Sequence, residues 1–132
     1  MNQAEHNKQF FLQYHAAVSG HVKTRELVSQ DVEDEKLIQH ILFFEQLFPV
    51  YATVLDEVIA EGEKVFVRAR LVGQHTGEAD GIPATNQSVE TPFALGYTIR
   101  NDKIINFWAI ADQIELMEQL GLSRQDIDVA PV

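Results

Sequence analysis

The feature that most constrains the fold is a change of hydrophobic period partway along the chain. Between Val65 and Thr76, apolar and polar side chains alternate at every second position, which is typical of an antiparallel strand with one buried face. Before Pro49, apolar residues instead recur every three or four positions, as on one face of a helix. Helices followed by strands, rather than alternating with them, indicate an α+β fold.

Three helices are predicted in the first third of the chain. The first covers residues 4–18 and stops at Gly20, and Thr24 can cap a short second helix. We expect Asp31 to cap the third helix, because acidic side chains crowd the turn that follows it, where the helix dipole favours them. Pro49 ends that helix, because proline cannot continue the hydrogen-bond ladder.

The remainder predicts strands, then one closing helix. Pro92 lacks an N–H group, so we expect it at a sheet edge or a bulge. Asn101 and Asp102 form a short hairpin turn. The predicted strands cover residues 51–60, 65–76, 89–100 and 104–111, and the closing helix covers residues 112–120.

The last predicted strand is apolar on both faces. Strict alternation puts Ile104, Trp108 and Ile110 on one face and Phe107 with three smaller neighbours on the other. One face can line an interior, and the second also needs a cover. Few helices remain to supply that cover, so we expect a homodimer formed through the sheet. Arg68 and Arg70 fall outside the interior, where we expect them to form ion pairs or contact the partner.

Composition and charge exclude several classes of function. The chain has 132 residues, enough for one domain, assigned here to residues 1–122 with a tail at 123–132. Its 20 acidic and 10 basic residues give a net charge of -10, which disfavours nucleic acid and anionic membranes as partners. There is no cysteine, and the five histidines lack the spacing of a metal site. With no signal peptide and no apolar run near the roughly 20 residues that span a bilayer, we expect a cytoplasmic protein.

Several short motifs occur in a fixed order along the last two thirds of the chain. Together they make the stretch from Phe43 to Leu122 resemble the SnoaL-like polyketide cyclases, also called predicted ester cyclases, of the nuclear-transport-factor-2-like superfamily. This resemblance implies a strongly curved, mostly antiparallel sheet that forms a cone-shaped barrel around a pocket, closed by the N-terminal helices and a C-terminal helix. The motifs are Phe48-Pro49, residues 60–65, 73–78 and 81–86, Lys103-Ile104, Trp108, Asp112 and residues 119–122.

The chain departs from the family pattern at three positions. Ala84 and Asn86 replace the usual proline and glycine of one loop motif, which implies a different loop shape. Phe107 stands where many members have a histidine, so a polar group beside the sheet is lost.

Asp112 has two competing interpretations. The resemblance implies that it is the general acid/base of an intramolecular aldol ring closure, chemistry that suits a carboxylate in an apolar pocket. The alternative is structural, because Asp112 followed by Glu115 is also the pattern of a helix cap. Backbone N–H groups that hold a capping carboxylate lower its pKa instead of raising it. The two roles could combine.

The other candidate residues also divide between site and core. His75 is either a satisfied core histidine or a pocket residue that binds a carbonyl or orients Asp112. Tyr97 is either packing or a ligand contact. His40 lies on a helix face that can close the mouth of the pocket, although a position at the surface or an interface is the preferred interpretation. The expected pocket lining is completed by Tyr14 and Phe44 at the mouth and by Phe93 and Trp108 in the wall.

Two functions follow from this site. The first is a cofactor-free cyclase or isomerase, in which Asp112 is the acid/base and His75 and Tyr97 polarise a carbonyl of the substrate. The second is a non-catalytic binding or dimeric scaffold domain with the same pocket. Both predict a small apolar or carbonyl-containing ligand, and neither requires a metal or a cofactor.

Overall fold

The computed structural model describes residues 1–122, and the predicted tail at 123–132 lies outside the described residues. The order of elements is helices first, then strands, then one helix, as predicted. The elements are α1 (Gln3–Val18), α2 (Arg25–Val28), α3 (Glu35–Leu47), β1 (Ala52–Glu61), β2 (Lys64–Gln74), β3 (Ser88–Arg100), β4 (Lys103–Ala111) and α4 (Gln113–Leu120).

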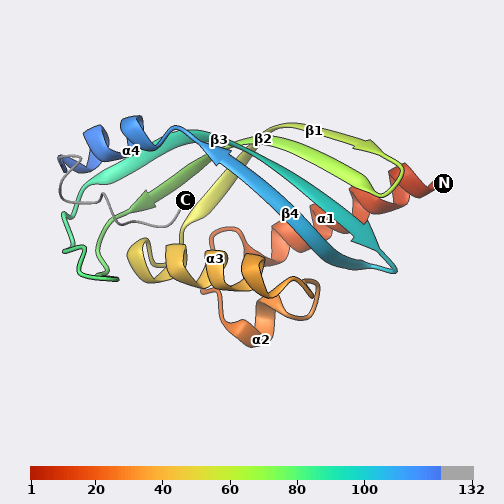
Figure 1. The fold of residues 1–132 in the computed structure, drawn as a ribbon, viewed down its shortest axis with the longest axis horizontal. Helices are drawn as coiled ribbons and strands as arrows, with labels where there is room; N and C mark the ends of the chain where they lie inside the picture. The colour runs from red at the N-terminus through yellow and green to blue at the C-terminus, as the bar shows by residue number, and fades with distance from the viewer. Residues whose placement is uncertain (123–132) are drawn as a thin grey trace.

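The four strands form one antiparallel sheet in the order β1-β2-β3-β4. The sheet is curved, with α1, α2 and α3 on one side of it and α4 at one end (Figure 1). The predicted α+β class and the curved antiparallel sheet are therefore confirmed.

Local signals explain most element boundaries. Thr24 caps α2 by accepting a hydrogen bond from the backbone N–H of Leu27 at 3.1 Å. The Asn101-Asp102 turn joins β3 to β4 with φ angles of 51° and 57°, the left-handed values of a tight hairpin turn. On one side, Pro92 of β3 pairs with Arg70 of β2. On the other side, the pairing of β3 with β4 begins only at the next residue, Phe93. Pro92 therefore lies at a local sheet edge, as predicted.

The predicted cap of α3 is wrong by three residues. Asp34 caps the helix, and its side chain accepts a hydrogen bond from the N–H of Lys36 at 3.0 Å. The backbone of Asp31 instead pairs with β4, because its carbonyl accepts from the N–H of Ile104 at 2.8 Å. The N–H of Glu33 returns a bond to the Ile104 carbonyl at 2.9 Å, so this segment covers part of the β4 edge.

The predicted faces of β4 are also wrong, because the strand contains a bulge. Ile99 pairs with Ile104 whereas Thr98 pairs with Asn106, so Ile105 is an extra residue on β4. An extra residue reverses which face each later side chain occupies. Ile104 is buried, yet Trp108, an even number of positions later, lies on the outer face.

Two clusters of buried residues surround a hollow on the inner side of the sheet. The first joins α1, α2 and α3 to the sheet around Phe11, Val65 and Ile99. The second joins the end of α3 to the opposite end of the sheet around Phe48 and Leu71. The hollow between them is the predicted pocket.

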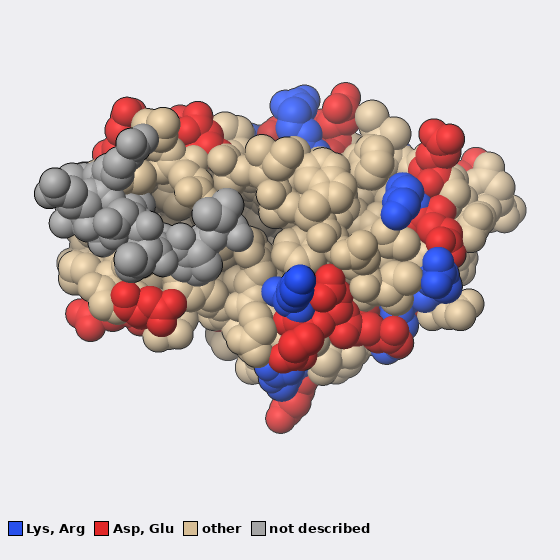
Figure 2. Space-filling model, in the orientation of Figure 1, with Lys and Arg blue, Asp and Glu red and all other residues tan. Residues whose placement is uncertain are grey.

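Charged side chains lie on the outside of the molecule. They lie in several separate groups on the face in Figure 2, one of them just below its middle, with uncharged surface between the groups. The arginines form surface ion pairs, as expected for Arg68 and Arg70: Arg68 with Glu57 at 4.0 Å, Arg70 with Asp56 at 3.0 Å and with Glu90, and Arg100 with Glu63 at 2.8 Å.

Candidate functional site

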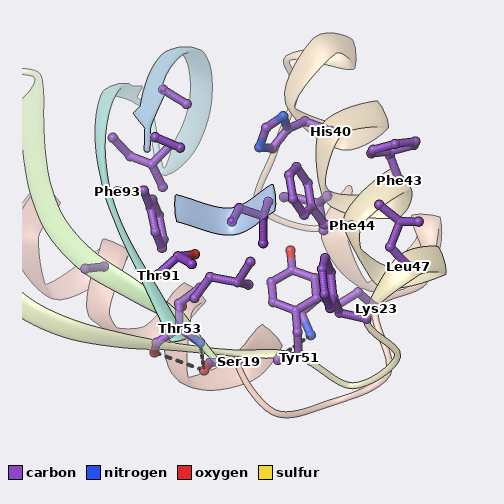
Figure 3. Close-up of a pocket in the computed structure, with 18 of the residues that line it drawn as sticks. Ser19, Lys23, His40, Phe43, Phe44, Leu47, Tyr51, Thr53, Thr91 and Phe93 are labelled. Atoms are coloured by element: carbon purple, nitrogen blue, oxygen red, sulfur yellow. Dashed lines mark hydrogen bonds between the residues drawn. The ribbon is translucent and has the colours of Figure 1, made fainter. Parts of the chain in front are cut away.

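A cavity of about 210 Å³ lies between the inner face of the sheet, α1, α3 and α4 (Figure 3). Most of its wall is apolar, which is typical of sites for small organic ligands. The polar part of the wall comes from Tyr14, His15, Ser19, Lys23, His40, Tyr51, Thr53, His75, Thr91, Tyr97, Asp112 and Gln113.

The structure brings six of the seven predicted site residues to this cavity. They come from five different elements or their ends, which only the tertiary fold can bring together. The six are Tyr14, Phe44, His75, Phe93, Tyr97 and Asp112.

Trp108 is the exception, and its predicted place in the wall is wrong. The bulge in β4 turns its side chain to the outer face of the sheet, where 47% of the residue is exposed. The indole lies across Gly96 on the neighbouring strand, since a Cβ there would come within 2.2 Å of the ring. Phe66 packs beside it, with the ring centroids 6.0 Å apart.

His75 is the most sharply defined polar group of the cavity wall. The backbone N–H of Thr85 points at its Nδ1 atom at 3.3 Å, so Nδ1 is an acceptor and the ring proton is on Nε2. His75 is fully buried, and Nε2 has no hydrogen-bond partner among residues 1–122. Burial lowers the pKa of His75, which keeps the ring neutral. The result is an unused N–H donor in the wall of an apolar cavity.

Two glycines of the same motif hold His75 in place. A Cβ at Gly77 would come within 1.7 Å of the Gln46 carbonyl oxygen, and one at Gly73 would come within 3.2 Å of Phe48. The absence of side chains at both positions lets the end of β2 pack directly against the end of α3. The His75 ring then lies 5.3 Å from that of Phe48.

Asp112 occupies the junction of β4 and α4. Its Oδ1 atom accepts a hydrogen bond from the backbone N–H of Glu115 at 3.0 Å, so the predicted helix cap is present. The residue is exposed, and it also contributes to the cavity wall. The cap uses one carboxylate oxygen, and Oδ2 accepts no hydrogen bond from the part of the chain that the structure describes.

The two predicted tyrosines lie deeper than expected. Tyr14 and Tyr97 are each only 5% exposed, and both pack around Phe11 in the first buried cluster. Tyr14 is therefore part of the inner wall instead of the mouth. Phe44 stacks against Phe48 at 6.3 Å.

His40 lies in the cavity wall, although it was expected at the surface or an interface. Its ring lies 4.8 Å from that of Phe44 and 5.6 Å from that of Phe107, and it is half-buried. Burial lowers its pKa, so the ring is predominantly neutral at neutral pH. The helical period contained the signal, because His40 is three positions after the buried Leu37 and four before Phe44.

Three further cavity residues were not singled out from the sequence. His15 follows Phe11 by one helical turn, and its Nε2 atom bonds the Thr53 carbonyl oxygen at 2.8 Å. Tyr51 continues the alternation that places Thr53 on the inner face of β1. No sequence pattern predicts a cavity position for Lys23. Its buried ammonium donates to the Tyr51 carbonyl at 2.6 Å and to Glu45 at 3.2 Å.

Residues 1–122 contain no group of three or more histidine, aspartate or glutamate side chains placed to hold a metal ion. Within the same range, no helix has the length and hydrophobicity needed to cross a lipid bilayer.

A curved antiparallel sheet wrapped around an apolar cavity and closed by helices is a cone fold. The family model for the SnoaL-like polyketide cyclases matches residues 19–120. The chain therefore belongs to this family, as the sequence motifs predicted. Among curated proteins, none matches the chain.

Solved structures share the fold at low sequence identity. A proposed SnoaL-like polyketide cyclase of Jannaschia sp. CCS1 is 20% identical, with a TM-score of 0.79 over 93% of this chain and 96% of that one. AclR of Streptomyces galilaeus, a proposed hydroxylase, is 16% identical, with a TM-score of 0.74 over 96% and 90%. A SnoaL-like polyketide cyclase of Agrobacterium tumefaciens is 13% identical, with a TM-score of 0.71 over 92% and 100%. Because one fold carries different named reactions, the fold alone does not define the chemistry.

Proposed function

We propose that this protein binds a small, mostly apolar, carbonyl-containing molecule in the cavity and catalyses its cyclisation or isomerisation by proton transfer alone. The observation that carries the proposal is an apolar cavity whose wall includes a carboxylate, Asp112, and an unused N–H donor, His75. An aldol closure needs a base near the carbon that loses its proton and a donor near the carbonyl oxygen. It needs no redox cofactor, because only protons and one carbon–carbon bond change.

The reaction assigns a role to each group. Asp112 takes a proton from a carbon flanked by carbonyls, and the C–H electron pair becomes part of an enolate. The enolate carbon attacks a second carbonyl of the same molecule, which forms the ring bond. The alkoxide that results takes the proton back from Asp112. The Nε2–H group of His75 stabilises negative charge on one of these oxygens in an environment without competing water.

The variant Asp112→Asn tests the acid/base role without removing the cap, because asparagine caps helices as well as aspartate does. Ring closure of a 1,3-dicarbonyl test substrate should slow by about 10²-fold or more, while the melting temperature stays nearly unchanged. Asp34→Asn is the matched control, since Asp34 caps α3 in the same way at a position that does not line the cavity. Unchanged turnover in Asp112→Asn would remove Asp112 from the mechanism.

A second candidate function, binding without turnover, is favoured by one observation. Asp112 is exposed, and the helix cap already uses one of its carboxylate oxygens, which accepts the N–H of Glu115. A protein that binds the test substrate but forms no product, with Asp112→Asn behaving like the wild type, would support this function.

We propose in addition that the protein is a homodimer through the outer face of the sheet. The strand register aligns Ile59, Phe66, Gly96 and Trp108 in one row across all four strands. Exposed apolar side chains that gather in a patch are typical of an interface. Those on the strands of this face are Val54, Ile59, Phe66, Trp108 and Ile110.

Phe66→Glu tests the dimer by placing a charge in the middle of this row. Sedimentation velocity should show a dimer for the wild type and a monomer for the variant, because an unpaired charge at an apolar interface is costly to desolvate. Val22→Glu is the control, since Val22 is also exposed, at 61% against 47% for Phe66, but lies outside the sheet. A wild type that sediments as a monomer contradicts the proposal.

A further inference from the structure

All three tyrosines of the chain line the same cavity. Tyr14 comes from α1, Tyr51 directly precedes β1, and Tyr97 comes from β3. Each residue is buried, with at most 9% of its surface exposed. Figure 3 shows the hydroxyl of Tyr51 pointing into the cavity.

The surrounding packing fixes these rings. Phe11 contacts both Tyr14 and Tyr97, with ring centroids 6.1 Å and 5.1 Å apart. The ammonium of Lys23 lies 3.8 Å from the centre of the Tyr51 ring and also bonds the Tyr51 carbonyl. Rings held from the side in this way keep their hydroxyls in place before a ligand arrives.

Among residues 1–122 the three hydroxyls make no hydrogen bond, and none of them is among the fully buried polar atoms that lack a partner, so they lie in the accessible wall of the cavity. Buried tyrosine hydroxyls normally have a partner, because an unpaired polar group in an apolar environment is costly. Two other hydroxyls of the cavity do have partners: Thr53 Oγ1 bonds His15 at 2.8 Å, and Ser19 donates to the Thr53 carbonyl at 3.2 Å and accepts from the Thr53 N–H at 3.0 Å. As far as residues 1–122 are concerned, the tyrosine hydroxyls are therefore available to bind a ligand.

Electrostatics defines the role that these hydroxyls can take. Burial raises the pKa of all three, and negative charge on Tyr14 would raise the pKa of Tyr51 and Tyr97 further. They consequently stay protonated at neutral pH. They act as hydrogen-bond donors to an oxygen and not as bases.

We propose that the hydroxyls of Tyr14, Tyr51 and Tyr97, which line one cavity, form a binding subsite for an oxygen of the ligand, of the carbonyl, enol or phenol class. This subsite is distinct from His75, which packs against Phe48 in the second buried cluster. It deepens the proposed function, on which it rests, because it requires the ligand to carry an oxygen that reaches these hydroxyls in addition to the one at His75.

The test compares 2-naphthol with naphthalene, which has the same rings but no oxygen, in equilibrium binding followed by ligand fluorescence. The wild type should bind naphthol more tightly than naphthalene. Tyr14→Phe should weaken naphthol binding about five- to tenfold, the effect of losing one hydrogen bond, and leave naphthalene binding unchanged. Tyr51→Phe and Tyr97→Phe should change naphthol binding in the same direction.

Ser19→Ala is the matched control, because it removes a cavity hydroxyl that already has partners within the protein, so the preference for naphthol should persist. Asp112→Asn should also keep this preference, which separates the subsite from the catalytic proposal. Equal binding of the two ligands by the wild type, no detectable binding of naphthol, or an unchanged preference in Tyr14→Phe would each overturn the subsite.

Discussion

At the scale of single residues, Val50 is held in a conformation that its side chain disfavours. Its φ angle is 62°, in the left-handed region where a β-branched residue is an outlier. The position joins the end of α3 to β1, and the N–H of Val50 donates to Glu45 at 2.8 Å. Glu45 in turn binds Lys23, so the strained residue lies in the network that supports the cavity wall.

Replacing Val50 with asparagine should therefore stabilise the protein. Asparagine tolerates positive φ, keeps the backbone N–H, and removes strain of about 1 kcal/mol. Thermal unfolding should show a higher melting temperature. Val22→Asn is the control at an exposed position without positive φ, where we expect a change within about 0.5 kcal/mol. A lower melting temperature for Val50→Asn would show that the Val50 side chain contributes more through packing than its backbone costs.

Single residues were predicted well where periodicity alone decides their position. Tyr14, His75 and Tyr97 lie on the expected inner faces of their elements. For His40 the surface position was the preferred prediction, whereas the helical period, which puts it beside Phe44, indicated the pocket. No pattern could have identified the strain at Val50, since valine is among the residues least expected at positive φ.

At the scale of elements, the end of β2 depends on a residue with no side chain. The ideal Cβ position of Gly77 is 1.7 Å from a backbone oxygen of α3, which cannot rotate away as a side chain can. Gly77→Ala should consequently separate β2 from α3 and lower the free energy of unfolding by at least about 2 kcal/mol. Denaturant titration measures the loss. Thr76→Ala, one position earlier and exposed, should change it little, and a tolerated Gly77→Ala would contradict the close packing.

Element types were predictable, whereas two local details were not. The acidic run from Asp31 to Glu35 offers more than one possible cap, and the pairing of Asp31 with Ile104 decides in favour of Asp34. Asp31 and Ile104 are far apart in the sequence, so no local sequence pattern could predict that they pair. The bulge at Ile105 could not be predicted from the sequence either, because an apolar residue is compatible with either face of β4.

At the scale of the whole molecule, the order of helices and strands follows from the sequence, but the hollow does not. Periodicity shows which side chains point inward, and it cannot show whether they fill the space they surround. The prediction of a pocket came from the motif resemblance. The structure gives that pocket a volume of about 210 Å³ and three histidines in its wall: His15, His40 and His75.

These three histidines should make the stability of the protein depend on pH. Burial lowers the pKa of each below its ordinary value of 6.5. Below about pH 6.5 the unfolded chain therefore binds protons that the folded protein does not, and the free energy of unfolding must fall. The loss begins near pH 6.5 and continues until the pH reaches the lowered pKa values of the folded state.

Urea unfolding at pH 7.5 and pH 5.5 measures this effect, and we expect lower stability at pH 5.5. His40→Phe should reduce the difference in unfolding free energy between pH 7.5 and pH 5.5, because it removes one of the three histidines that bind a proton on unfolding. Phenylalanine at this position retains the contacts with Phe44 and Phe107. His21→Gln, at an exposed position outside the cavity, serves as the control. Equal stability at both pH values would mean that the three rings take up protons as readily in the folded protein as in the unfolded chain, and the cavity would then be far wetter than its apolar wall implies.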